Sequence, residues 1–198
     1  RMDADMNVLI LAGSPRPAGN TAELVKFFSD ELAHGGANVK RIDLNGLNVS
    51  PCLGCYRCQQ VAGAYGCPQN DCMQSIATEI VAADALVFAT PIYTWQATAP
   101  MKAVMDRMYG LNKFYGEAPR EVLNAGQTYA LIATCGYEPH AYGADLLSEA
   151  LRRWCEHSAL PYLGMYAVRD TDDLASFQTP EAESGAREFA KYLLQKNS

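Results

Sequence analysis

Two short stretches of this sequence carry side chains that could do chemistry. The first, from Gly13 to Thr21, reads Gly-Ser-Pro-Arg-Pro-Ala-Gly-Asn-Thr and combines hydroxyl, guanidinium and amide donors with glycines that let the backbone fold closely around an anion. The second, from Cys52 to Cys72, holds five of the seven cysteines. The sequence therefore predicts an anion-binding loop and, separate from it, a thiol-rich loop.

The first loop fits a terminal monophosphate best. A helix is expected to begin at Asn20 or Thr21, where free backbone amides and the positive end of the helix dipole converge. Neither the Gly-Lys-Ser/Thr of a P-loop nor a G-x-G-x-x-G is present, which disfavours a nucleoside triphosphate or a pyrophosphate-bridged dinucleotide. A plain strand-to-helix turn capped by Asn20 or Thr21 is the alternative. Such a turn does not need Arg16 between two prolines, so the binding interpretation is favoured.

The thiol-rich loop has the spacing of a metal-cluster motif. Cys52, Cys55 and Cys58 are each separated by two residues, and Cys67 is followed by proline. Ferredoxins use such a C-x2-C-x2-C run with a Cys-Pro as ligands of a [4Fe-4S] cluster, and Cys67 or Cys72 could supply the fourth thiolate here. The rivals are reactive thiols, cysteines without a metal, and a zinc site, which usually needs a second cysteine or histidine pair. Disulfides are not expected in a reducing cytosol.

Hydrophobic periodicity predicts the elements that position these loops. Strands are expected over residues 7–12, 38–44, 85–89, 129–134 and 162–168, and helices follow them from about 21, 76, 100, 142 and 180. Five alternations of strand and helix predict an α/β fold with a five-stranded parallel sheet of order 2-1-3-4-5 and helices on both faces. Ligands then bind beyond the carboxyl ends of the strands, near the loops after Ala12, Ala89 and Thr134.

Composition narrows the class of protein. Apolar residues make up 49% of the 198 residues and charged residues 19%, which is typical of a globular chain, and residues 6–198 are expected to form a single domain. Residues 1–5 are interpreted as an added or leader segment. The net charge of -6 disfavours nucleic acid as a partner, and no apolar run is long enough to span a membrane. Without a signal-like segment near the start, the protein is expected in the cytoplasm.

The motifs together resemble one known family. The run Gly13-Ser14-Pro15-Arg16 with Gly19-Asn20-Thr21, the spaced cysteines, Pro91-Ile92-Tyr93, and Lys102 with Asp106-Arg107 are similar to the NADPH-dependent FMN reductase group of the flavodoxin-like superfamily, including its iron-sulfur flavoproteins. The resemblance covers residues 7–109 by motif and the remainder by strand order. It implies a flavodoxin-like three-layer sandwich that binds FMN, takes electrons from NAD(P)H and forms a homodimer or homotetramer.

The resemblance also implies site residues. The FMN phosphate would be held by the first loop, and the isoalloxazine would be lined by the segments after the third and fourth strands. The cofactor-binding residues expected on this basis are Ser14, Arg16, Gly19, Asn20, Thr21, Pro91, Ile92, Tyr93, Thr94, Trp95, Cys135, Gly136 and Tyr137. On composition alone, Tyr93 and Trp95 could instead be core or subunit-interface residues, and Cys135 a small buried residue. No catalytic acid or base is assigned, because electron transfer is the chemistry of the flavin.

The proposed cluster ligands are Cys52, Cys55, Cys58 and Cys67, but two features depart from the iron-sulfur flavoproteins. Eight residues separate Cys58 from Cys67, more than the compact motif usually has, and Cys72 stands where many relatives have aspartate. These departures favour a loop without metal, for which anaerobic purification would yield little iron or sulfide.

Three functional hypotheses follow. The first is an FMN-dependent oxidoreductase that passes electrons from NAD(P)H to a small acceptor such as a quinone, a nitro or azo compound, a flavin or a metal ion. The second is an iron-sulfur flavoprotein that carries electrons between protein partners. The third is a scaffold that binds no flavin. The sequence leaves the acceptor and the choice of NADH or NADPH open.

Overall fold

The chain folds around a parallel sheet with helices on both faces. The structure, a computed structural model, describes residues 6–114, 123, 126–170, 177 and 179–197. The sheet has the order β2-β1-β3-β4-β5, which confirms the predicted flavodoxin-like topology. Its strands are β1 (Asn7–Ala12), β2 (Asn38–Asp43), β3 (Ala85–Pro91), β4 (Thr128–Cys135) and β5 (Tyr162–Arg169).

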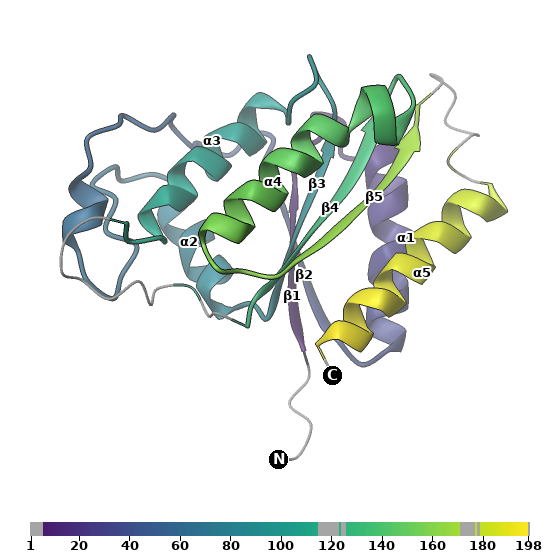
Figure 1. The fold of residues 1–198 in the computed structure, drawn as a ribbon, viewed down its shortest axis with the longest axis horizontal. Coiled ribbons are helices and arrows are strands. Elements are labelled where there is room, and N and C mark those ends of the chain that lie inside the picture. Colours follow the sequence, from purple (N-terminus) through teal and green to yellow (C-terminus); the bar gives the residue numbers. More distant parts are fainter. Residues whose placement is uncertain (1–5, 115–122, 124–125, 171–176, 178, 198) are drawn as a thin grey trace.

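Helices cover both faces of the sheet (Figure 1). On the first face lie α1 (Asn20–His34) and α5 (Pro180–Lys196), and on the second lie α2 (Met73–Ala82), α3 (Ala99–Arg107) and α4 (Asp145–His157). Right-handed crossovers between parallel strands produce this arrangement. None of the helices along the described ranges has the length and apolar character that a membrane crossing requires.

The inner strands carry the core. All eight residues of β4 are buried, and the five apolar residues of β1 that follow Asn7 are buried as well. Such continuous apolar runs are typical of strands covered on both faces. Two apolar clusters result, one with Phe28 under α1 and α5, the other with Met101 and Leu151 under α2, α3 and α4. The carboxyl ends of β1, β3 and β4 are thereby held side by side.

The predicted elements differ from the observed ones mainly at their ends. The fourth predicted helix, expected from about Tyr142, begins at Asp145, because a separate π-helical turn, η3 (Pro139–Gly143), precedes it. The long aperiodic stretch after β2 contains a 3-10 turn, η1 (Arg57–Gln60), and a second such turn, η2 (Met108–Gly110), follows α3. Residues 115–122, at the centre of the irregular stretch after η2, lie outside the described residues.

Candidate functional site

The loop Gly13 to Thr21, called here the phosphate loop, is a closed turn at the end of β1. The Ser14 hydroxyl accepts a hydrogen bond from the backbone N–H of Arg16 at 3.1 Å, and the Gly19 N–H donates to the Arg16 carbonyl at 3.1 Å. Because α1 begins at Asn20, its first backbone N–H groups open toward the loop. The loop therefore brings the first backbone amides of α1 next to a closed turn that carries Arg16.

Neighbouring elements hold the phosphate loop in place. The Thr98 hydroxyl donates to the Gly13 carbonyl at 2.6 Å, and the Gly13 N–H donates to the Ala89 carbonyl at 2.8 Å. A Cβ at Gly13 would lie 2.8 Å from the Thr98 Oγ1 and 2.9 Å from the Met101 Cβ, so the start of α3 packs where a side chain would be. The Thr21 and Thr134 hydroxyls share a buried hydrogen bond of 2.9 Å, which joins α1 to the end of β4.

The segment after β3 forms a tight turn with exposed aromatic side chains. Tyr93 and Gln96 exchange two backbone hydrogen bonds of 3.0 Å, and both residues between them, Thr94 and Trp95, have positive φ, at 52° and 59°. A non-glycine residue rarely adopts this conformation, and it is often found at functional sites. The Trp95 indole is 46% exposed and its N–H donates to the Tyr142 carbonyl at 2.9 Å, which excludes the core interpretation of Trp95.

A cavity of about 380 Å³ lies between these segments at the carboxyl ends of the strands. We call it the strand-end cavity. It brings together eleven of the thirteen predicted cofactor-binding residues. It is lined by Ser14, Arg16, Gly19, Asn20, Thr21, Pro91, Ile92, Tyr93, Thr134, Cys135, Gly136, Tyr137 and Asp170.

The two other predicted residues, Thr94 and Trp95, line an adjoining hollow of about 220 Å³. The rings of Trp95 and Tyr137 are parallel to within 1°, with centroids 6.0 Å apart, in the range of offset aromatic stacking. Tyr137 lines both the hollow and the strand-end cavity. The aromatic pair thus forms the rim between the two spaces.

Cys135 is a buried residue at the end of β4. It is 3% exposed, and burial raises the pKa of its thiol. Its Sγ contacts the π-helical turn, where a Cβ at Gly143 would lie 2.6 Å from it. This environment agrees with the interpretation of Cys135 as a small buried residue. Its small side chain forms part of the cavity wall.

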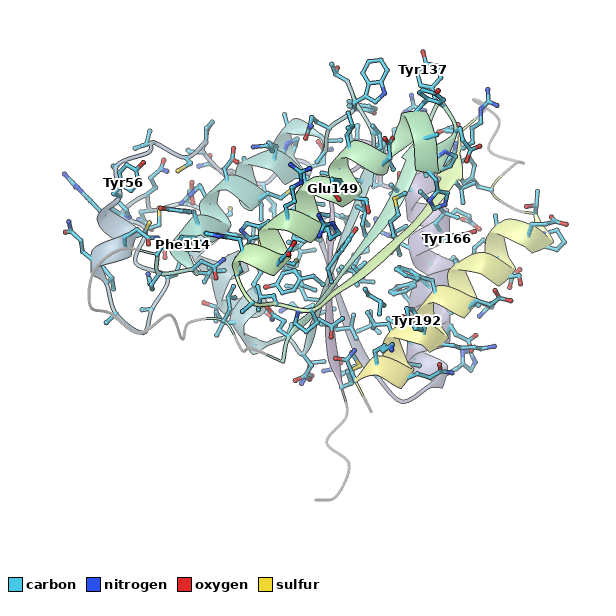
Figure 2. The ribbon with its side chains drawn as sticks, viewed as in Figure 1. Tyr56, Phe114, Tyr137, Glu149, Tyr166 and Tyr192 are labelled. Atoms are coloured by element: carbon cyan, nitrogen blue, oxygen red, sulfur yellow. The ribbon has the colours of Figure 1, made fainter. Side chains whose placement is uncertain are left out.

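A second cavity, of about 250 Å³, lies in the thiol-rich segment. We call it the cysteine cavity. It is lined by four cysteines, Cys52, Cys55, Cys58 and Cys67. Arg107, the last residue of α3, also forms part of its wall. Figure 2 places Tyr56, which also lines the cysteine cavity, and Tyr137, at the rim of the strand-end cavity, in well-separated parts of the molecule.

The structure distinguishes the two candidates for the fourth thiol. Cys72 does not line the cavity. It directly precedes α2, and its backbone N–H donates to the Asn48 carbonyl. Cys67, in contrast, lies on the cavity and accepts a hydrogen bond from the Arg107 guanidinium at 3.4 Å. Burial would raise the pKa of the Cys67 thiol, but hydrogen bonds from the Gln69 backbone and from Arg107 outweigh burial and lower that pKa.

Arg107 is fixed by a buried ion pair with Asp71. The two side chains are 1% and 4% exposed, and Arg107 also donates to the Ser50 carbonyl at 3.2 Å. Burial alone would raise the pKa of Asp71, but bonds from Arg107 and from the Ser50 and Met73 backbone hold it below its ordinary value. The Arg107 Nε is buried and has no hydrogen-bond partner in the described part of the chain. One N–H donor of this buried guanidinium is therefore unsatisfied.

Lys113 is the second buried cation of this region. It is 2% exposed, and its Nζ donates to the carbonyls of Cys58 at 2.6 Å, Gly110 at 2.7 Å and Tyr65 at 3.4 Å. Burial lowers the pKa of Lys113. Next to it, the Gln59 amide, also buried, donates to the Tyr109 and Asn112 carbonyls at 2.8 Å. These bonds attach the cysteine segment to the residues that follow α3.

The thiols of this region do not form a single-ion site. Over the described ranges, no three His, Cys, Asp or Glu side chains are grouped so that they could hold one metal ion. A tetrahedral zinc site would require sulfur atoms about 3.8 Å apart, as its Zn–S bonds of about 2.3 Å dictate. In a polynuclear cluster each thiolate binds a different metal atom, so the sulfur atoms lie farther apart than around one zinc ion and the cavity between them is wider.

Several residues in or next to the two cavities were not predicted as site residues from the sequence. Thr134 was recognised only as a strand end, and Asp170 lies after β5, beyond the loops that the topology rule indicates. Arg107 belongs to the Asp106-Arg107 motif that resembles the family, but no role was assigned to it. Lys113 and Gln59 gave no signal, since a lone lysine or glutamine in an irregular segment is usually exposed.

The fold and the strand-end cavity define a class: a flavodoxin-like α/β protein with a cavity lined by polar side chains at the reversal point of the sheet. Residues 6–172 match the sequence model of the family described as NADPH-dependent FMN reductase. The chain belongs to this family, as its motifs predicted. The family is one of flavin-dependent oxidoreductases, which accords with the class of this site.

Curated relatives include both iron-sulfur flavoproteins and a quinone oxidoreductase. An iron-sulfur flavoprotein of Methanocaldococcus jannaschii is 33% identical over 52% of this chain and 51% of its own length. One of Archaeoglobus fulgidus is 27% identical over 75% of the chain and 64% of its own length. An FMN-dependent NADH:quinone oxidoreductase of Thiobacillus denitrificans is 29% identical over 51% and 47%. The chain thus spans about half of the length of most relatives it matches.

Solved structures share the fold. The NAD(P)H:quinone oxidoreductase from Methanothermobacter marburgensis superposes with a TM-score of 0.64 at 18% identity, over 98% of this chain and 96% of its own. A flavodoxin of Streptococcus pneumoniae gives 0.58 at 16% identity, over 96% and 99%. At these identities the likeness concerns the fold alone.

Proposed function

We propose that the chain binds FMN in the strand-end cavity and passes electrons from NAD(P)H to a small acceptor, with quinones the first class to test. The observation that carries the proposal is the meeting of the phosphate loop with the Pro91–Tyr93 and Gly136–Tyr137 segments around one cavity. A quinone is preferred because a relative and a structural neighbour are named quinone oxidoreductases.

The residues of the cavity divide the work of binding. Ser14, Arg16, Asn20 and Thr21 would hold the phosphate through their donors and the first amides of α1. The backbone of residues 91–95 and 135–137 would position the flat ring, and Tyr93, Trp95 and Tyr137 would provide aromatic contact. FMN, when bound, supplies the redox chemistry itself, so no side chain is required as an acid or base.

A visible absorption spectrum tests this proposal. Purified protein saturated with FMN and passed through a desalting column should retain flavin bands near about 370 and 450 nm, which bleach when NADPH is added without air. Menadione should then restore them. Protein that stays colourless after incubation with FMN would contradict the proposal and favour the scaffold hypothesis.

A second candidate function, electron carriage between protein partners, is favoured by the cysteine cavity. Four thiols and the buried Arg107 line a space of about 250 Å³, and a second buried cation, Lys113, bonds to the carbonyl of Cys58 beside it. This donor set fits a [4Fe-4S] cluster, which Cys52, Cys55, Cys58 and Cys67 would hold and which would supply one-electron chemistry when bound. Several relatives are named iron-sulfur flavoproteins.

Iron and sulfide content separates the two candidates. About four irons and four sulfides per chain after anaerobic reconstitution, together with slow steady-state oxidation of NAD(P)H, would favour the carrier. Fast oxidation with little iron would favour the reductase and the metal-free interpretation of the cysteine loop. A cytoplasmic location and a dimeric or tetrameric assembly are part of the same proposal, and light scattering of the flavin-loaded protein tests the assembly.

A further inference from the structure

Two buried cations lie at the cysteine cavity, Arg107 in its wall and Lys113 beside it, and only Arg107 is paired with a carboxylate. The Asp106 carboxylate, which also lines the cavity, pairs with the exposed Lys102. Arg107 and Lys113 are the only positively charged residues in the described ranges that are buried, and both belong to this region. Asp71 neutralises Arg107, but no ion pair joins Lys113 to a carboxylate anywhere in the part of the chain that is described. An unpaired buried ammonium costs considerable free energy, even when carbonyl oxygens surround it. Its presence indicates an anion nearby.

The cavity itself is where such an anion would lie. Lys113 bonds to the carbonyl of Cys58, whose side chain lines the cavity, and Arg107 bonds to the sulfur of Cys67 on the wall. A [4Fe-4S] group held by four thiolates carries net negative charge, because the four negative charges of the thiolates exceed the positive charge of the iron-sulfide core.

We infer that Lys113 and Arg107 are positioning residues that stabilise the reduced, more negative form of a cluster in the cysteine cavity and thereby raise its reduction potential. A positive charge close to a redox centre favours the state with the added electron, and N–H···S bonds act in the same direction. Arg107 supplies the bond to sulfur, and Lys113 supplies the uncompensated charge. This inference rests on the proposed cluster and not on the proposed flavin site.

The experiment compares variants of the full chain after anaerobic reconstitution with ferrous iron and sulfide. Lys113→Met removes the charge and keeps the apolar stem, while Lys113→Arg keeps the charge. Lys26→Met removes one exposed charge from α1, on the opposite face of the sheet, and is the matched control. Cluster potentials are measured by dye-mediated titration with detection by electron paramagnetic resonance. Bound FMN is measured in parallel by absorbance.

At the wild-type midpoint, we expect the ratio of reduced to oxidised cluster to fall about tenfold in Lys113→Met, a shift of about 59 mV for one electron. Lys113→Arg and Lys26→Met should stay close to the wild type. A purely structural role would leave the potential unchanged, so an unshifted, fully loaded Lys113→Met would overturn the inference.

Loading decides the remaining outcomes. If folded Lys113→Met takes up no cluster and Lys113→Arg does, the charge is required to hold the anion and the inference stands. If neither variant loads while the wild type does, Lys113 acts by packing and the inference is wrong. It is equally wrong if the wild type takes up no iron or sulfide, and retained FMN would then show that the flavin proposal survives.

Discussion

The strand-end cavity and the cysteine cavity both collect polar or sulfur-bearing side chains, but they are built in different ways. The first lies where the parallel strands β1, β3, β4 and β5 end, and its walls are backbone turns of a few residues each. The second lies within a long segment with little regular structure, which buried side chains attach to α3 and to the residues after it. One site depends on the sheet, the other on a few buried polar groups.

This difference has an energetic consequence. A loop at the end of a buried strand keeps its shape because the strand and the next helix are fixed by the apolar core. Within residues 51–64 only Gln59 is buried, so hydrogen bonds of Arg107, Lys113 and Gln59, rather than an apolar core, hold the cysteine segment. Removal of one such group leaves its partners buried and unsatisfied. Single substitutions should therefore affect the cysteine segment more than the strand ends.

The largest effect is expected from the buried ion pair. Asp71→Asn should lower the free energy of unfolding by about 3 to 5 kcal/mol, because Arg107 is left as an uncompensated buried charge. The pKa of Asp71 in the folded protein lies below its ordinary value of about 3.9. The ion pair therefore stabilises the protein fully at pH values above about 3.9. This stabilisation is lost as the pH falls through the lower folded pKa. The difference between variant and wild type should therefore shrink in acid.

Urea unfolding at pH 7 and at pH 3 measures both parts of this prediction. The matched control is Asp106→Asn, which breaks the exposed pair with Lys102 on α3, where both side chains are nearly half exposed. Exposed pairs contribute about 0 to 1 kcal/mol. Equal losses in the two variants would mean that the cysteine segment does not depend on its buried pair.

The same contrast explains what could be predicted from the sequence. The strands and the phosphate loop were predictable because an apolar run followed by glycine and proline is a local signal, and the carboxyl ends of parallel strands meet by topology. The four cavity cysteines were predictable from their spacing. Lys113 was not, because its acceptors are carbonyls as far as 55 residues away and a lysine is ordinarily exposed. Asp170 reaches the strand-end cavity only because β5 lies beside β4.

The next effect in size concerns the phosphate loop. Arg16→Gln should weaken FMN binding about 10- to 100-fold, since a hydrogen bond to a charged group contributes about 1.5 to 3 kcal/mol. The unfolding free energy should hardly change, because Arg16 is exposed. Fluorescence titration of the apoprotein with FMN gives the affinity. Arg153→Gln on the exposed face of α4 is the control, and a similar loss there would mean that overall charge, not the loop, determines binding.

The smallest effect tests whether the phosphate loop depends on the sheet, as the comparison requires. Gly13→Ala would place a methyl group 2.8 Å from the Thr98 Oγ1 and 2.9 Å from the Met101 Cβ, so α3 would have to move away from the end of β1. Such overpacking typically costs about 1 to 3 kcal/mol. Gly136→Ala is the control for stability, because a Cβ there meets no atom within 4 Å. If thermal unfolding showed the two variants to be equally stable, the contact between α3 and the loop would not fix the loop, and the strand-end cavity would be less rigid than its position on the sheet implies.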